Sequence, residues 1–273
     1  MRELIERAAS DLVNSTYAIA LTGAGISTES GIPDFRGPDG IWTKNPRAEA
    51  EAYEHYGQLR KDPRAHWEEI LTPGSIISLF DKFPDYPANR GHIALAELEQ
   101  IGILKAVITQ NADSLHQKAG SLNVIEYHGS MAKLRCMDCG ARFPRRDFDL
   151  QKMQKQKELP PRCRKCGGVL KYDGVYFGEP IPEDVSRAGL EEARKCDLML
   201  VCGTSAVVYP FAELPRIARQ RAGVTIIEVN GEPTPLTDEG VSDYLVQGRI
   251  GEVLPAIVDE VKRLKGTAGA TLR

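Results

Sequence analysis

Two periodicities of apolar residues alternate along most of the chain. Between Arg2 and Asn14 the apolar positions recur at the spacing of an amphipathic helix, and Tyr17–Thr22 is a short apolar run that ends at a glycine, as a strand before a turn does. The alternation continues toward the carboxyl end. It predicts further strands at 104–109, 124–127, 197–202 and 224–229, and further helices at 91–100, 112–119, 182–194, 211–220 and 250–264.

Strands that alternate with helices predict an α/β fold, in which helices cover both faces of a mainly parallel sheet. Ligands of such sheets bind outside the carboxyl ends of the strands. The positions of interest therefore follow the predicted strands directly, after Leu21, Ile108, Tyr127, Cys202 and Val229.

The composition limits the classes of partner. The chain has 273 residues, 42% of them hydrophobic, and a net charge of −3, which argues against a general binder of nucleic acid. No apolar run approaches the roughly 18 residues of a membrane-spanning helix, and the mixed charges of residues 2–7 are unlike a secretory leader. We expect neither a nucleic-acid nor a membrane partner, and a cytoplasmic location.

Four of the six cysteines form two Cys-x-x-Cys pairs, each followed by a glycine. In a reducing compartment this spacing favours a metal over disulfides, and four thiolates complete the tetrahedral coordination of zinc. A closed site has no position for a water ligand, so we expect one structural zinc ion held by Cys136, Cys139, Cys163 and Cys166. The alternative is a set of incidental thiols or a redox dithiol.

Two stretches depart from the alternation. Residues 41–77 are polar and contain three prolines, and residues 131–171 contain the cysteine pairs. We interpret them as a helical insertion and a zinc-ribbon insertion that together form a smaller zinc-binding domain. The remaining chain would be a Rossmann-like domain of residues 1–40, 78–130 and 172–265, followed by a mobile tail at 266–273.

A glycine-rich turn, Thr22–Ser27, follows the first predicted strand. Glycines at such a turn let the backbone approach a pyrophosphate closely, which indicates a nucleotide. The motif alone is weakly specific, because Thr28 takes the place of the third glycine of the dinucleotide fingerprint. The next loop, Gly31–Gly37, presents an acid, an aromatic residue and a base. Polar clusters also end the other strands, at Thr109–Asp113, His128-Gly129, Gly203–Ser205 and Asn230.

In type, order and spacing these motifs, with Phe177-Gly178-Glu179, resemble those of the sirtuin family in its prokaryotic-type core form. The family consists of NAD-dependent protein lysine deacylases. The resemblance implies NAD as co-substrate, acylated-lysine proteins as substrates, and nicotinamide and O-acyl-ADP-ribose as products. The NAD-binding residues that it implies are Gly23, Ala24, Gly25, Asp34, Phe35, Arg36, Gln110, Asn111, Ala112, Asp113, Gly203, Thr204, Ser205, Asn230, Glu232 and Ile250.

The resemblance also implies catalytic roles for His128 and Asn111. His128 suits a general base, because imidazole titrates near neutral pH, and Phe35 would keep water from the reacting centre. Asp113 and Asn111 could instead cap the following helix, and we expect His116 to be structural. The peptide would add an extended strand beside the substrate-binding residues Val175, Tyr176, Phe177 and Gly178.

Two departures from the family concern the acyl group. Ala112 stands where members commonly have a bulkier aliphatic residue, and Gly174-Val175 stands where they have a valine pair. Together they imply roomier nicotinamide and acyl pockets, and the latter could accept longer acyl groups. The Tyr-x-x-Arg pair that recognises acidic acyl groups in one branch has no counterpart, since Ile70 and Pro73 take its place. We therefore disfavour succinyl and malonyl groups.

Three other functions stay open. A protein mono-ADP-ribosyltransferase would use the same NAD pocket. A non-catalytic zinc ribbon would bind protein or nucleic acid through the basic run Arg142–Arg146, but it would have no use for His128 or Gln110. A dehydrogenase is disfavoured by the altered glycine fingerprint. The oligomeric state, the physiological target and the preferred acyl chain do not follow from the sequence.

Overall fold

The larger of two β-sheets organises most of the chain. The computed structural model describes residues 1–75 and 83–271, and there six strands run parallel in the order β3-β2-β1-β7-β8-β9. They are β1 (Ala18–Thr22), β2 (Leu104–Thr109), β3 (Val124–Glu126), β7 (Leu198–Cys202), β8 (Thr225–Asn230) and β9 (Tyr244–Gln247). The α/β fold with a parallel sheet is therefore confirmed.

The central strands of this sheet are buried on both faces. Every residue of β1 and β7 is buried, which explains why both strands stand out in the sequence as continuous apolar runs. The bounds of five strands agree with the predicted ones to within one residue. Strand β9 was missed because it lies at the edge, where only Val246 is buried.

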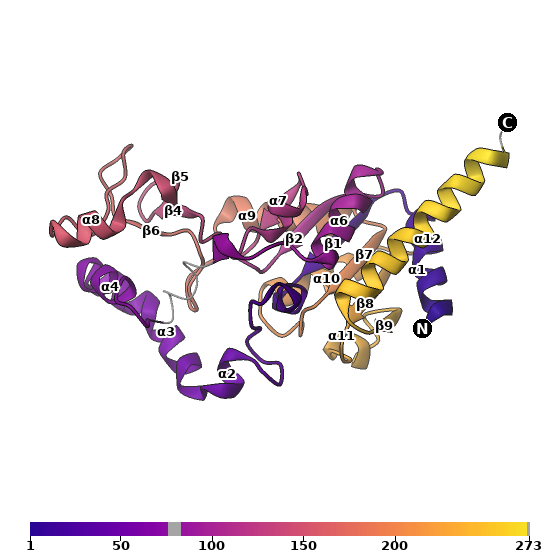
Figure 1. Ribbon diagram of the computed structural model, residues 1–273, viewed down its shortest axis with the longest axis horizontal. Helices are drawn as coiled ribbons and strands as arrows, with labels where there is room; N and C mark the ends of the chain where they lie inside the picture. Colours follow the sequence, from indigo (N-terminus) through magenta and orange to yellow (C-terminus); the bar gives the residue numbers. More distant parts are fainter. Residues whose placement is uncertain (76–82, 272–273) are drawn as a thin grey trace.

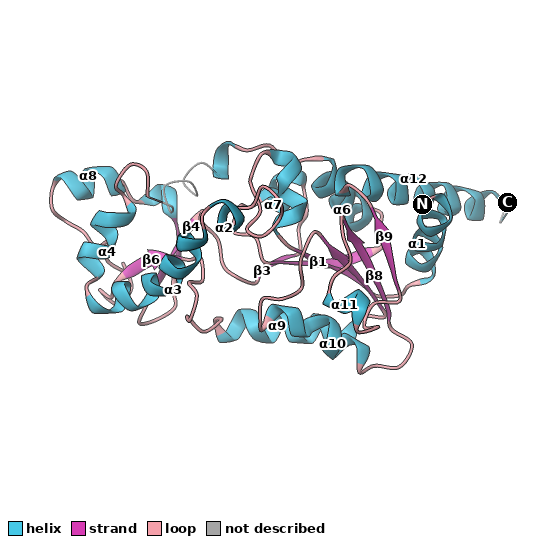
Figure 2. Cartoon of the chain, turned by 90° about the horizontal axis from the view of Figure 1, so that it is seen from below, coloured by secondary structure: helices cyan, strands magenta, loops and turns pink. Residues whose placement is uncertain are grey.

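Helices cover both faces of the larger sheet (Figure 2). One face packs against α1 (Arg2–Asn14), α6 (Arg90–Gln100) and α12 (Ile250–Thr271), and the other against α9 (Glu183–Lys195) and α10 (Leu214–Arg219). Successive residues of β1 divide between the two apolar clusters: Ala18 and Ala20 belong to the first, and Ile19 and Leu21 to the second. This alternation fixes the three-layered arrangement.

Some predicted helices differ at their ends. Helix α7 (Leu115–Ala119) is shorter than the predicted 112–119, because Ser114 has a left-handed φ of 60° and Asp113 accepts the first N–H of the helix at 2.9 Å. The helix predicted at 211–220 begins as a 3₁₀ turn, η4 (Phe211–Glu213), before α10. Helix α12 continues to Thr271, so residues 266–271 of the expected tail are helical, and their mobility stays a prediction.

The smaller sheet lies at the other end of the elongated molecule (Figure 1). Its antiparallel strands are β4 (Lys133–Cys136), β5 (Arg142–Pro144) and β6 (Leu170–Tyr172), and α4 (Pro63–Ile70) and α8 (Leu150–Lys155) share its apolar cluster. Helices α2 (Ile41–Lys44) and α3 (Pro46–Lys61) precede α4 in the chain. Trp67 of α4 donates a hydrogen bond to the carbonyl of Leu170 in β6 at 2.8 Å. The two stretches that depart from the alternation therefore pack on each other. The expected boundary between residues 77 and 78 lies outside the described residues.

Short elements complete the chain. They are α11 (Pro235–Asp238) and the 3₁₀ turns η1 (Ala24–Ser30), η2 (Phe83–Asp85) and η3 (Arg145–Asp147). Within residues 1–75 and 83–271, none of the helices combines the length and the apolar character needed to cross a membrane.

Candidate active site

A cavity of about 1530 Å³ lies at the carboxyl edge of the larger sheet. The glycine turn after β1 and the polar clusters after β2, β3, β7 and β8 all contribute to its wall. Of the residues predicted to bind NAD or substrate or to act in catalysis, all line this cavity except Gly23, which begins the turn. The loops that follow the strands therefore meet at one cavity, as expected, because β1 lies between β2 and β7 in the sheet.

The turns after β1 and β7 approach each other too closely for side chains. The N–H of Gly25 donates to the carbonyl of Gly203 at 2.8 Å. A Cβ atom added at Gly25 would lie 2.8 Å from the same oxygen, and one added at Gly23 would lie 2.7 Å from Cβ of Thr204. Both positions therefore require glycine, and the backbone of the two turns forms one side of the cavity.

Side-chain amides join the turns across the strand ends. Gln110 Nε2 donates to Thr204 Oγ1 at 2.7 Å, which connects the loop after β2 with that after β7. Asn111 Nδ2 donates to the carbonyl of Gly23 and to Ser27 Oγ, both at 3.0 Å. These bonds hold the two amides in place before any ligand binds, as preorganised sites require. The geometry gives Asn111 no helix-capping role.

Asp113 has two structural partners. Its Oδ2 accepts a hydrogen bond from Ser27 Oγ at 2.7 Å, and its Oδ1 accepts one from the N–H of Leu115 at 2.9 Å. Burial raises its pKa, although these hydrogen bonds act in the opposite direction. The alternative role of Asp113 at the start of α7 is thus present alongside its place in the cavity wall. His116 is fully buried and hydrogen-bonded to Thr22, which agrees with a structural role.

His128 follows β3 and faces the cavity. Burial lowers its pKa to about 4, although a hydrogen bond with the backbone of Gln110 acts in the opposite direction. The near-neutral pKa expected from the residue type is therefore not retained, because burial disfavours the charged ring. At pH 7 the imidazole is neutral and has a nitrogen that can accept a proton. The carbonyl of His128 accepts the N–H of Val175 at 2.8 Å, so the backbone ties this histidine to the predicted substrate segment.

A row of aromatic rings crosses the cavity wall. The ring of Phe35 lies 4.9 Å from that of Trp42, which lies 5.4 Å from Phe177, and Phe177 lies 4.7 Å from Tyr53. The guanidinium of Arg36 stacks on Trp42 at 4.3 Å. The row links the loop after η1 to the substrate segment. The sequence analysis missed Trp42, and an aromatic residue inside a polar stretch was the only signal for it.

The four paired cysteines form a single cluster. Their sulfur atoms all lie within 4.8 Å of one another, and in the pairs Cys136–Cys166 and Cys139–Cys163 they are 3.5 and 3.7 Å apart. Zn–S bonds of about 2.3 Å in a tetrahedron place the sulfur atoms about 3.8 Å apart. The donor set and its spacing therefore fit a zinc ion, and the closed set of thiolates fits a structural one.

Buried ion pairs connect this cluster region to the cavity. Lys171 Nζ lies 3.0 Å from Glu179 Oε2, and Arg135 pairs with Glu179 at 2.5 Å and with Asp173 at 3.1 Å. Glu179 also accepts the N–H of Tyr176 at 3.0 Å. The predicted substrate segment, Val175–Gly178, is thus anchored to β4 and β6. Arg142 of the basic run pairs with Asp173 and Asp184, so these carboxylates offset its positive charge.

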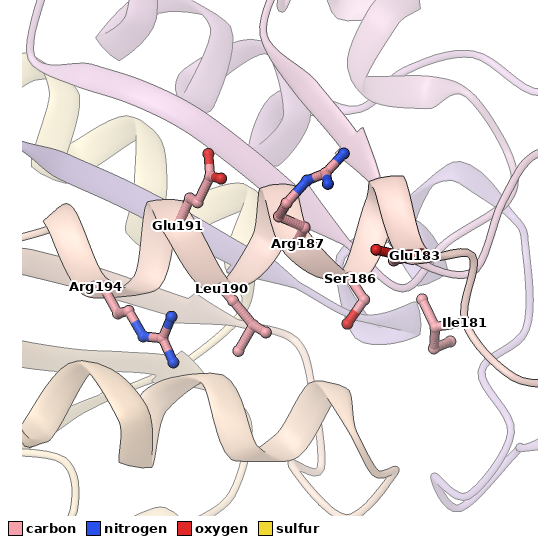
Figure 3. A pocket seen from close by; sticks show the side chains of 7 residues that line it. All are labelled: Ile181, Glu183, Ser186, Arg187, Leu190, Glu191 and Arg194. Atoms are coloured by element: carbon pink, nitrogen blue, oxygen red, sulfur yellow. The ribbon is translucent and has the colours of Figure 1, made fainter.

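A smaller hollow lies along α9 beside the cavity (Figure 3). Ser186 and Leu190 point to one side of the helix, and Arg187 and Glu191 to the other. Its charged residues alternate in sign along the helix, and it contains none of the predicted site residues. We assign it no role.

A parallel sheet with a glycine turn after its central strand, polar groups at the strand ends and a four-cysteine module defines an α/β nucleotide-binding protein with a zinc-binding insertion. The Sir2 family profile matches residues 23–210, and the chain belongs to this family. It is 47% identical to NAD-dependent protein deacylase 2 of Archaeoglobus fulgidus over 268 residues, which are 97% of this chain and 99% of that protein. Identity to NAD-dependent protein deacylase 2 of Pyrobaculum aerophilum is 45% over 252 residues, 92% and 94% of the two chains.

Solved Sir2 structures agree with this assignment. A Sir2 homologue in complex with NAD is 40% identical with a TM-score of 0.76, and the match covers 95% of this chain and 94% of that one. Sir2Af2 bound to a myristoylated histone peptide is 41% identical with a TM-score of 0.69, covering 98% and 100%.

Proposed function

We propose that this protein is an NAD-dependent protein lysine deacylase, which transfers the acyl group of a modified lysine to ADP-ribose and releases nicotinamide. The observation that carries the proposal is the convergence of a neutral histidine, two glycine turns and preorganised amides on one cavity. Relatives with more than 40% identity over almost the whole chain are named as deacylases.

The proposed NAD site has three parts. The turn at Ala24-Gly25 and the loop Asp34–Arg36 would hold the pyrophosphate, and Gln110, Asn111 and Asp113 would form the nicotinamide pocket. The adenosine half would lie against Gly203–Ser205, Asn230, Glu232 and Ile250. NAD, when bound, supplies the ADP-ribose that accepts the acyl group. Phe35 and Trp42 exclude water from the reacting centre.

His128 acts as the general base. Because its pKa is about 4, its ring is unprotonated at neutral pH and accepts a proton from a ribose hydroxyl as the acyl group is transferred. The peptide would lie along Val175–Gly178. The N–H groups of Val175 and Tyr176 already donate to His128 and Glu179, so a peptide strand must pair with other backbone groups of this segment.

Neutral acyl groups longer than acetyl are part of the proposal. Ala112, Met131, Phe83 and Tyr176 both line the cavity and pack on the apolar cluster of the smaller sheet. The cavity therefore extends from His128 toward an apolar core, which suits a hydrocarbon chain. The complex of Sir2Af2 with a myristoylated peptide supports this extension.

The division of the chain into a Rossmann-like domain and a smaller domain also belongs to the proposal, with the smaller domain formed by residues 41–77 and 131–171. Its support is the separate apolar cluster around Trp67 and Leu134. We further propose a cytoplasmic location, because a cluster of four zinc-binding thiolates needs a reducing compartment.

Mass spectrometry of a reaction with NAD and an acetyl-lysine peptide tests the proposed function. We expect deacetylated peptide, nicotinamide and acetyl-ADP-ribose, and a rate about 10²- to 10⁴-fold lower for His128→Ala, since a general base contributes about that much. His55→Ala is the matched control, because His55 lines the same cavity from α3 but belongs to no motif.

Two results would change the proposal. Label from NAD that accumulates on protein without loss of the acyl group would identify a mono-ADP-ribosyltransferase. Absence of nicotinamide release with both acetyl and long-chain peptides would end the deacylase assignment.

A further inference from the structure

Glu228 of β8 is a buried carboxylate that the proposed reaction does not use. Its side chain is fully buried, and three hydroxyl groups donate to it: Thr234 to Oε2 at 2.5 Å, and Thr237 and Ser242 to Oε1 at 2.5 and 2.6 Å. No cation among the described residues forms an ion pair with it. Burial of a carboxyl group is unfavourable unless hydrogen bonds replace those it made with water. The three hydroxyl groups provide these bonds.

The three donors come from the two ends of one loop. The loop joins β8 to β9 and contains α11, whose first turn is closed by reciprocal bonds: the N–H of Leu236 donates to Thr234 Oγ1, and the N–H of Thr234 donates to Thr237 Oγ1. Ser242 lies just before β9. Glu228 therefore joins the start of the loop to its end through one side chain.

One side of this loop forms part of the cavity wall. Gly231, Glu232, Pro233, Thr234 and Pro235 line the cavity, whereas Thr237 and Ser242 do not. The neighbouring Asn230 donates to the carbonyl of Thr204 at 3.1 Å, which joins the base of the loop to the turn after β7. Glu228 lies outside the cavity and, through its hydrogen bond with Thr234, fixes the wall that would contact the adenosine half.

We infer that Glu228 is a positioning residue for NAD: it fixes the β8–β9 loop in the shape that binds the adenosine half of the co-substrate. The inference rests on the proposed function. A loop that is ordered before binding loses less conformational entropy when the ligand arrives. Loss of these bonds should therefore weaken NAD binding and leave the chemical step at His128 unchanged.

Asp197 provides a matched control at the amino ends of the strands of the same sheet, opposite the cavity. It stands just before β7, and its carboxylate accepts the hydroxyls of Ser15 and Thr16 and the N–H groups of Thr16 and Tyr17, the latter two at 2.9 and 3.0 Å. None of these residues lines the cavity. Asp197 thus fixes a connection in the same manner as Glu228, but away from the proposed NAD site.

The main test variant is Thr237→Val/Ser242→Ala, which removes two of the three donors without substituting a residue that lines the cavity, although it also removes the acceptor of the Thr234 N–H. We expect the KM for NAD and the Kd for ADP-ribose, measured by calorimetry, to rise about tenfold, which is about 1.4 kcal/mol of binding. We expect kcat and the KM for the acetyl-lysine peptide to stay within about twofold of the wild type, since their determinants lie elsewhere. Glu228→Gln retains one acceptor oxygen and should show a smaller rise.

Thermal unfolding separates positioning from stability. Asp197→Asn should lower Tm and leave the KM for NAD unchanged. If the double variant and Glu228→Gln lower Tm in the same way with unchanged KM for NAD and unchanged Kd for ADP-ribose, the inference is overturned and the deacylase assignment stands. If the wild-type protein binds neither NAD nor ADP-ribose, both are overturned. Should the double variant fail to fold, Thr237→Val alone gives the same comparison.

Discussion

The two sheets of the molecule are stabilised in different ways. In the larger sheet every residue of β1 and β7 is buried, and apolar clusters cover both faces. The smaller sheet has one apolar cluster, and beside it lie four thiols and the buried charges of Lys171, Asp173 and Glu179, each no more than 6% exposed. Regions with a small apolar core are often stabilised by metals, and here a zinc site and buried ion pairs supplement the apolar cluster.

The difference matters for function because the smaller sheet holds one wall of the cavity. Glu179, anchored by Lys171 and Arg135, accepts the N–H of Tyr176 within the proposed substrate segment. The proposed nucleotide side of the cavity is formed instead by the turns that follow strands of the larger sheet. Perturbations of the smaller sheet should therefore affect peptide binding first, and NAD binding less.

Removal of zinc is expected to have the largest effect. Structural zinc contributes about 10–16 kcal/mol in small zinc modules, so a chelator or Cys136→Ser should unfold the region around β4–β6 and abolish deacylation. The larger sheet has its own apolar clusters and should stay folded. Hydrogen exchange should then show loss of protection in residues 131–171 and retention in β1 and β7.

Cys202→Ser is the matched control for zinc removal, because Cys202 is fully buried in β7 and remote in sequence from the cluster. It should lower Tm and leave the zinc content at one ion per chain. Full activity of zinc-free protein would contradict the structural assignment of the metal.

Removal of the buried charge of Lys171 should have the next largest effect on stability. Lys171→Met leaves Glu179 with Arg135 as its remaining cation, and loss of one partner of a buried pair costs about 3–5 kcal/mol. We expect a lower Tm and a raised KM for the peptide, because Lys171 Nζ also donates to the carbonyl of Gly174 at 2.7 Å. Urea unfolding and steady-state kinetics measure the two effects.

Leu200→Ala in β7 gives the comparison from the larger sheet. It removes a fully buried side chain and should cost about 2–5 kcal/mol, with no specific change in the KM for the peptide. Equal kinetic effects of the two variants would show that the smaller sheet has no special connection to peptide binding.

Acid should destabilise both regions through buried histidines. Burial lowers the pKa of His66, His92 and His128 to about 4. Between pH 6.5 and 4 the unfolded chain takes up protons that the folded chain excludes, so the free energy of unfolding falls by about 1.4 kcal/mol per pH unit and histidine. Above pH 6.5 the three residues are neutral in both states and contribute no slope.

Urea unfolding between pH 7.5 and 4.5 measures this slope. His66→Phe should lower the slope by about 1.4 kcal/mol per pH unit, which corresponds to one proton. In zinc-free protein the contributions of His92 and His128 should persist if the larger sheet remains folded. A stability independent of pH below 6.5 would contradict the burial of these imidazoles.

The sequence predicted the two regions with unequal detail. The apolar runs of β1 and β7 and the spacing of Cys136, Cys139, Cys163 and Cys166 are local signals, and the structure agrees with both. The pairing of Lys171 with Glu179 and the stacking of Trp42 on Phe177 depend on contacts between distant segments. No periodicity marks such residues, which is why they emerged only from the fold.

The smallest expected effect concerns acyl length at the boundary between the two regions. A Cβ atom at Gly174 would lie 3.1 Å from Met131 Sδ, so Gly174→Val narrows the cavity where it meets the apolar cluster of the smaller sheet. We expect kcat/KM for a myristoyl-lysine peptide to fall about tenfold relative to that for an acetyl-lysine peptide, in line with the 1–3 kcal/mol that a methylene-sized change in an apolar pocket produces.

Gly174→Ala and Ala112→Ile extend this test to a graded series. If the proposed acyl path is right, Gly174→Ala should have a smaller effect on the long chain than Gly174→Val. Ala112→Ile should act in the same direction, because Ala112 lines the cavity beside that cluster; the KM for NAD is measured as well, since Ala112 is also a predicted NAD-binding residue. On the proposed path only the long chain extends to the apolar cluster, so kcat/KM for the acetyl-lysine peptide serves as the internal control. An equal fall for both peptides would contradict the proposed acyl path.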